Sequence, residues 1–407
     1  MRRGFKMRIV FIDLHCINFL VRPYIQIKSK NKVATYKHKF IIDYAMKEGI
    51  EVCNYITGKE TTIPSIARVS RILKYDKEKK IARWEANYVM KHCFAPASNI
   101  KIITKKEDIR SDDIVIGYFY KKYQRDIIAG LNAQKIMMGN HFVEINEPVD
   151  LEKIGIKGFV NEIDLSDNPF VNTYIKIRPE KNIVCPYIYA NRFVDKQKER
   201  KNKAMAIGTL STCKGNAGYK LYRDMFHTEW IQLMRKTIYE EAEKYSEYID
   251  SYISYIYEDK LEISEDDNIF IRIYKKMVNK YKPWRQSKYT SFDMVNKFNE
   301  YLCFVCPEEV VGMPGIGFVE GMACGTAYIG LDTSYYRKLG LKPGIDYITY
   351  DGTLEDLIDK IKYCQAHVEE TRKIGINGRE FVYKNFNQKV VAKNLFDKFN
   401  ELVYREH

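Results

Sequence analysis

Short apolar runs alternate with longer amphipathic stretches along the first half of the chain. The run Met7 to Leu14 is mostly apolar, and the amphipathic stretch Tyr36 to Glu48 after it ends at Gly49. Continuous apolar runs are typical of parallel strands buried on both faces, and a period of 3.6 residues predicts helices. The pattern predicts further strands at 101–104, 113–119, 135–139 and 183–189. This alternation favours an α/β domain with a parallel sheet.

A second α/β set follows a change in composition. Residues 191–203 are dense in charge, and we place an inter-domain linker there. The pattern then predicts strands at 204–210, 301–306 and 327–331, and helices at 224–260, 269–281, 291–300 and 379–402. Thr353 and Asp356 form a capping box before one more helix. The expected domains are 1–190, 204–385 and a terminal helix at 386–407 that packs on the first domain.

Composition adds constraints on size and partners. The chain has 407 residues, of which 45% are hydrophobic and 29% charged, which fits two folded domains. Its net charge of +14 favours phosphate-bearing partners, namely nucleic acid, an anionic membrane or a nucleotide sugar. No run of 18 apolar residues occurs and no signal peptide is evident. We expect a cytoplasmic protein that meets a membrane, if at all, only at the inner surface.

The nine cysteines are scattered and mostly lie in apolar contexts. Cys303 and Cys306 form a Cys-x-x-Cys, but the motif falls inside a predicted strand, and no second pair completes a zinc site. We expect these two residues to be reduced members of a core.

The most informative stretch runs from Pro307 to Asp332, between two predicted strands. Its loop exposes the backbone N–H groups of Gly315, Ile316 and Gly317, where side chains are small or absent and an anion can approach. A short helix over 318–324 follows. This combination suits the binding of a nucleotide diphosphate.

Other features of this stretch allow competing interpretations. Glu320 lies in the helix's first turn, where a carboxylate can accept hydrogen bonds from sugar hydroxyls, and Gly325 is a natural left-handed cap. A dinucleotide-binding turn is one alternative, but its third glycine position is occupied by Glu320. The other alternative is a glycine-rich connection that binds no ligand.

The two α/β sets and this loop together resemble the GT-B glycosyltransferases. The loop is most similar to a large retaining family with paired glutamates (glycosyltransferase family 4-like, group 1). The second glutamate corresponds to Glu320, and the Met322–Ile329 stretch matches the family pattern after it. Gly312 stands at the position of the first glutamate. Glu308 or Glu309 could replace that missing carboxylate.

The resemblance implies roles for particular residues. It assigns Glu320 to the nucleotide ribose and His141 to the donor sugar as the two catalytic candidates. Thr209, near the end of the 204–210 strand, and Lys214, in the loop after it, would contact the diphosphate, together with the N–H groups of the glycine loop and with Glu309. His15, after the first strand, is a weaker candidate at the carboxyl end of the first sheet.

The resemblance also implies a fold and an activity. The fold is two Rossmann-like domains facing across a cleft. The activity is transfer of a hexosyl or deoxyhexosyl group from a nucleotide-diphosphate sugar to a glycan or lipid-linked acceptor, with retention, in cell-surface polysaccharide synthesis. No Asp-x-Asp occurs, so we expect no essential metal, and we expect no cofactor. Lysines are spread throughout the chain and no RNA or DNA motif appears, so we expect no nucleic-acid partner. The alternatives are a basic nucleic-acid-binding α/β protein and a nucleotide-sugar epimerase or dehydrogenase.

Overall fold

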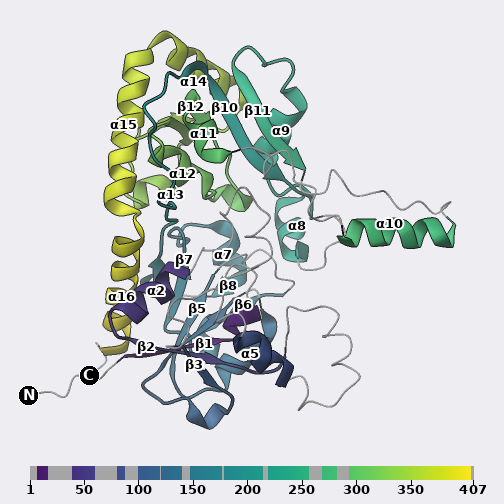
Figure 1. Cartoon of the computed structure of the whole chain (residues 1–407), viewed down its shortest axis with the longest axis vertical. Helices are drawn as coiled ribbons and strands as arrows, with labels where there is room; N and C mark the ends of the chain where they lie inside the picture. Colours follow the sequence, from purple (N-terminus) through teal and green to yellow (C-terminus); the bar gives the residue numbers. More distant parts are fainter. Residues whose placement is uncertain are drawn as a thin grey trace, which may run out of the picture. The chain divides into compact units, whose positions relative to one another are not determined.

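The computed structural model divides the chain into two compact units (Figure 1). Unit 1 comprises Met1–Ile188, Asn216–His227 and Asn385–His407, and unit 2 comprises Tyr189–Gly215 and Thr228–Lys384. The structure describes residues 7–16, 39–59, 80–87, 100–119, 121–139, 147–176, 178–213, 219–255, 268–281 and 293–404.

Unit 1 is built on a parallel sheet whose described strands follow the order β3-β2-β1-β4-β5-β7-β9. Their bounds are β1 Arg8–Ile12, β2 Glu51–Tyr55, β3 Ile100–Ile103, β4 Ile114–Tyr118, β5 Gln134–Met138, β7 Gly158–Asn161 and β9 Asn182–Val184. Every residue of β1 and β4 is buried, which explains their mostly apolar sequence. Arg8 of β1 is paired with Asp113 at 2.5 Å. A small second sheet pairs β6 (Val149–Asp150) with β8 (Ile175–Lys176).

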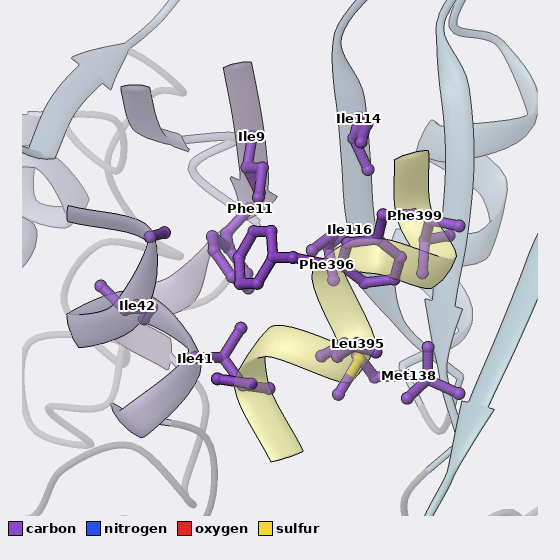
Figure 2. Close-up of a cluster of buried hydrophobic side chains, with 14 of the residues drawn as sticks. Ile9, Phe11, Ile41, Ile42, Ile114, Ile116, Met138, Leu395, Phe396 and Phe399 are labelled. Carbon is purple, nitrogen blue, oxygen red and sulfur yellow. The ribbon is translucent and has the colours of Figure 1, made fainter. Parts of the chain in front are cut away.

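The helices of unit 1 come from distant parts of the chain. They are α2 Lys39–Lys47, α5 Lys122–Ala129, α6 Leu151–Ile154, α7 Pro169–Tyr174, α8 Lys220–Phe226 and α16 Gln388–Tyr404, with the 3₁₀ turns Leu14–Cys16, Lys106–Asp108 and Pro179–Lys181. Figure 2 shows how Phe396 and Phe399 of α16 lie against Ile9, Phe11 and side chains of β4. The chain's last helix therefore covers the sheet that its first strand begins.

Unit 2 is built on a parallel sheet whose described strands follow the order β11-β10-β12-β13-β14. Their bounds are β10 Lys201–Leu210, β11 Ile249–Tyr255, β12 Tyr301–Val305, β13 Ala327–Leu331 and β14 Ile348–Tyr350. Its helices are α9 Leu233–Glu241, α10 Ile269–Tyr281, α11 Met294–Phe298, α12 Gly317–Ala323, α13 Ser334–Lys338, α14 Leu354–Ala366 and α15 Val368–Asn385, with a 3₁₀ turn at Val310–Gly312. The α/β class with parallel sheets is confirmed.

Several local predictions are also confirmed. The Thr353 hydroxyl accepts a hydrogen bond from the Asp356 N–H at 3.2 Å and caps α14. Gly325 adopts φ +71° after α12, where a side chain would be strained. Cys303 and Cys306 are buried and free, as expected of core residues.

The prediction of one helix over 224–260 is wrong. Residues Ile249–Tyr255 form β11, which pairs in parallel with β10 along seven residues, from Ala204 opposite Ile249 to Leu210 opposite Tyr255. The tyrosines and isoleucines of this segment fit a helical period in the sequence. The edge of β10, however, offers backbone hydrogen bonds that only a strand can complete.

The charged segment 191–203 does not behave as a solvated linker. Phe193 is fully buried, and Asp195 forms ion pairs with Arg200 at 3.3 Å and Arg379 at 2.8 Å within unit 2. The strand β10 already begins at Lys201. Segment Asn216–His227, which the sequence boundaries place in the second domain, lies in unit 1, where Phe226 stacks on Phe170.

None of the helices within the described ranges combines the length and apolar character that crossing a bilayer requires.

Substituting Phe399 tests the packing of α16 on unit 1. Phe399 is fully buried, and its ring lies 5.7 Å from that of Phe396. We expect Phe399→Ala to lower the free energy of unfolding by about 3–5 kcal/mol, because the cavity cannot collapse fully. Urea denaturation followed by circular dichroism measures this. Lys398→Ala, on the exposed side of the same helix, should change it by less than about 0.5 kcal/mol, and equal effects of the two variants would contradict the packing.

Candidate nucleotide-binding site

The candidate site lies where the strand order of unit 2 changes direction. The strand β10 is flanked by β11 on one side and β12 on the other. The chain runs from β10 to β11 on one side and then crosses back to β12 on the other side. In open α/β sheets, ligands bind beside the carboxyl ends of the strands at such a point. The segments after β10 and β12 contain most of the residues that the sequence singled out.

Arg235 of α9 joins these two strand ends. Its side chain is 2% exposed, and its Nη1 donates to the carbonyl oxygen of Thr209 at 3.0 Å. Its Nε donates to the carbonyl oxygen of Pro307 at 2.8 Å, and its Nη2 pairs with Glu309 Oε1 at 2.7 Å. One guanidinium thus satisfies carbonyls from both strand ends and presents a cation at the edge of the sheet.

Gly208 makes room for this guanidinium. A Cβ at position 208 would lie 2.6 Å from Nε of Arg235, and the backbone there has φ +154°. A larger residue would displace the guanidinium from the strand end.

The two glutamates after β12 have different environments. Glu308 is buried and accepts hydrogen bonds from the Leu331 N–H at 3.0 Å and the Tyr336 hydroxyl at 2.9 Å. Burial raises the pKa of Glu308. Glu309 is about one-third exposed and is held by Arg235 and by Gln232 Nε2 at 3.0 Å. Of the two, only Glu309 is partly open to solvent.

Glu320 lies in the first turn of α12 and is 2% exposed. Among the described residues, nothing donates a hydrogen bond to its carboxylate or forms an ion pair with it. Burial raises its pKa from 4.5 to about 8, and nearby Arg192 offsets this only partly. A buried carboxyl group without a partner costs free energy and therefore indicates a site for a ligand.

Arg192 is the charged group that acts on Glu320 within unit 2. Its Nε and Nη2 are both buried and have no hydrogen-bond partner. These two nitrogens share one edge of the guanidinium, the edge that binds two oxygen atoms at once. Arg192 and Glu320 therefore present unsatisfied donors and an unsatisfied acceptor in the same region.

The three residues of the glycine loop lie directly before and at the start of α12. Ile316 is the N-cap residue, and the N–H groups of Gly315, Ile316 and Gly317 donate no backbone hydrogen bond to other described residues. A Cβ at Gly317 would lie 2.8 Å from Sγ of Cys306, so this glycine also lets the helix pack on β12. Packing alone is thus sufficient to require Gly317.

Other predicted site residues are not brought together here. His141 and Lys214 lie outside the described residues. Thr209 contributes its carbonyl oxygen to Arg235, as described above.

His15 belongs to unit 1, after β1. Asn54 accepts from the Leu14 N–H, so its amide nitrogen must donate to Nδ1 of His15 at 3.1 Å. The proton of the neutral ring is then on Nε2, which is buried without a partner. Burial lowers the pKa of His15 to about 4, so the ring is neutral at pH 7.

Sequence reasoning missed Arg192 and Arg235. Arg235 shares the buried face of α9 with Ile238, and an arginine on an apolar face is a signal that could have been noticed. Arg192 carries no such signal, because it precedes a run of charges that predicts solvent exposure.

Within the described ranges, His, Cys, Asp and Glu side chains form no group of three or more that could hold a metal ion.

Comparisons with known proteins concern one segment of the sequence and the fold. The sequence model of the glycosyl transferase-like family matches residues 283–397, which include β12, the glycine loop, α12 and β13. A search of curated protein sequences gives no match.

Solved structures resemble the chain over nearly its whole length. A glycosyltransferase from Rickettsia africae ESF-5 is 15% identical, with 98% of this chain and 99% of that one covered and a TM-score of 0.52. Anabaena Alr3699/HepE in complex with UDP is 10% identical, with 97% and 100% covered and a TM-score of 0.52. Sucrose-phosphate synthase from Thermosynechococcus elongatus is 11% identical, with 97% and 99% covered and a TM-score of 0.50. The chain has the α/β fold of GT-B glycosyltransferases.

The raised pKa of Glu320 predicts a pH-dependent stability. Because the folded-state pKa is raised, the contribution of the Glu320 carboxyl group to stability is fully present below about pH 4.5 and is lost as the pH rises through about 8. Relative to Glu320→Gln, the wild type should therefore lose up to about 5 kcal/mol across that window. Thermal unfolding of both proteins between pH 5 and 9 measures the difference.

Glu199→Gln, which removes an exposed carboxylate, controls for the change in net charge. If the wild type and Glu320→Gln kept a constant difference in melting temperature across this range, the burial of a strained carboxyl group would be refuted.

The contacts of Arg235 predict that removing its side chain lowers the free energy of unfolding more than neutralising Glu309 does. Arg235→Met leaves two carbonyls and Oε1 of Glu309 without the guanidinium donor, so we expect the free energy of unfolding to fall by about 3–5 kcal/mol. Glu309→Gln keeps an amide oxygen facing Arg235, and Glu309 is partly solvated, so about 1 kcal/mol is expected. Urea denaturation compares them. Similar losses in both variants would mean that the strand-end carbonyls do not depend on Arg235.

Proposed function

We propose that this protein is a glycosyltransferase that takes a sugar from a nucleoside-diphosphate donor bound at the strand edge of unit 2. The observation that carries the proposal is the buried carboxyl group of Glu320, which has no hydrogen-bond partner among the described residues. It lies within the segment that matches the glycosyl transferase-like family. The fold similarity and the UDP and UDP-glucose complexes of Anabaena Alr3699/HepE support the same donor class.

The proposed donor position assigns complementary roles to the site residues. The ribose diol donates its two O–H groups to Glu320, and ligand oxygens accept from Nε and Nη2 of Arg192. The N–H groups of Gly315, Ile316 and Gly317 would face the diphosphate. Lys214 and Thr209 remain predicted contacts of the same diphosphate.

The chemistry follows from what leaves the sugar. Cleavage of the anomeric C–O bond releases a nucleoside diphosphate, and the developing negative charge on its oxygen must be stabilised. Fixed backbone dipoles and cations can do this without a metal ion, which is our proposal for this site. A contact between His141 and the donor sugar, which the family resemblance implies, and retention of anomeric configuration belong to the same proposal.

Our proposal also covers the donor sugar, the acceptor and the pathway. We propose a hexosyl or deoxyhexosyl donor, a glycan or lipid-linked acceptor, and a role in surface polysaccharide synthesis at the cytoplasmic face of a membrane. The support is the basic net charge together with the donor-site geometry.

Nucleotide binding is the first test. A panel of UDP, GDP, ADP, CDP and dTDP is added to the full-length protein, and thermal unfolding is recorded. One nucleotide at 100 times its dissociation constant should stabilise the wild type by about 2.7 kcal/mol, and Glu320→Ala should lose most of this shift. Arg192→Gln should weaken binding, and Arg192→Lys should not restore it, because lysine keeps the charge but lacks the two-nitrogen edge.

Other results would contradict individual parts of the proposal. No response to any nucleotide, or an equal shift in Glu320→Ala, would refute the donor site. Salt-dependent binding of RNA or DNA without a nucleotide response would favour the nucleic-acid alternative. Transfer activity that disappears on adding EDTA would refute metal independence.

A further inference from the structure

The helix α10, Ile269–Tyr281, which Figure 1 labels, has many exposed apolar side chains. Phe270 is 80% exposed, Ile269 65% and Tyr274 63%. Ile271, Ile273 and Met277 are exposed as well. Large apolar side chains in this number on one short helix are unusual on a soluble surface and mark an interaction site.

The apolar side chains gather on one face of α10. At about 100° per residue, positions 270, 273, 274, 277 and 281 share one side of the helix, whereas 272, 275, 276 and 279 share the other. Phe270, Ile273, Tyr274 and Met277 are exposed, whereas Arg272 and Lys275 are half-buried. Lys276, on the charged side, is exposed as well. An ordinary surface helix turns its apolar face inward, whereas α10 leaves this face accessible to solvent.

The charge of α10 identifies the kind of surface it fits. Its 13 residues include Arg272, Lys275, Lys276 and Lys280 and no carboxylate, within a chain of net charge +14. A helix with an apolar face, aromatic residues and flanking cations suits the boundary between anionic lipid headgroups and acyl chains. At about 20 Å long it is too short to span a bilayer and would lie in the plane of the surface.

We propose that α10 docks the protein on an anionic lipid bilayer, with its apolar face inserted among the acyl chains and its cations facing the headgroups. Charge complementarity favours this occupant over a second copy of the chain, because two α10 helices would bring eight cations together without a carboxylate. The proposal does not depend on the identity of the nucleotide or of the acceptor.

Vesicle flotation of the full-length protein tests the apolar face. The wild type should float with vesicles of phosphatidylglycerol and phosphatidylcholine and bind vesicles of phosphatidylcholine alone much more weakly. Phe270→Glu and Met277→Glu should each reduce binding at least tenfold. Ile345→Glu is the matched control, because Ile345 is an exposed apolar residue outside α10, and it should bind like the wild type.

A second pair of variants tests the charge. Lys276→Glu should weaken binding at least fivefold, whereas Lys198→Glu, an exposed lysine outside the helix, should have little effect. Binding should also fall as salt is raised from 0.05 to 0.5 M. Melting temperatures near that of the wild type would show that the variants are folded.

Three results would overturn the proposal. The first is wild-type binding to neutral vesicles as strong as to anionic ones, and the second is unchanged binding of both Phe270→Glu and Met277→Glu. The third is a concentration-dependent dimer that Phe270→Glu dissociates while vesicle binding is absent, which would assign the face to a second copy. A nucleotide-induced thermal shift retained by Phe270→Glu separates each of these from a failure of the donor site.

Discussion

Where neighbouring parallel strands diverge at the edge of a sheet, their last backbone N–H and C=O groups lose hydrogen-bond partners in the sheet. In each unit of this protein, one buried side chain forms hydrogen bonds with such groups. In unit 1, Gln124 of α5 accepts from the Tyr118 N–H at 2.7 Å and donates to the Ile12 carbonyl at 2.9 Å. In unit 2, Arg235 joins the ends of β10 and β12. Each polar group sits where the strand order changes direction, which is where α/β sheets bind ligands.

The two bridging side chains differ in charge, and this separates the units chemically. Gln124 is neutral, so it connects two strand ends of unit 1 without introducing a charge. Arg235 carries a cation with a partly exposed carboxylate partner, and the neighbouring Arg192 and Glu320 keep polar atoms unsatisfied. Buried polar groups that cost stability are expected where function requires them, and for this reason we propose that the donor binds in unit 2. This is the physical basis of our functional proposal.

Local signals predicted much of the fold. The buried strands β1, β4, β12 and β13, the cap at Thr353 and the span of α10 follow from periodicity and capping chemistry, which act between neighbours in sequence. The strand β11 was missed because its side chains fit a helical period, and its pairing with β10 is a long-range contact. The sequence marked Glu320 as a candidate residue of the site, whereas no motif marked Arg192 or Arg235.

The sequence by itself determined that β1, β4, β12 and β13 are strands, that α12 ends before Gly325 and α14 begins after Thr353, and that Glu320 stands in a helix's first turn. Only the tertiary structure decided that the charge of Arg192 acts on Glu320, that Arg235 supports two strand ends, and that α10 exposes its apolar face. The reason is that periodicity and capping depend on residues a few positions apart. The partner of a buried charge and the exposed face of a helix depend on how distant elements pack.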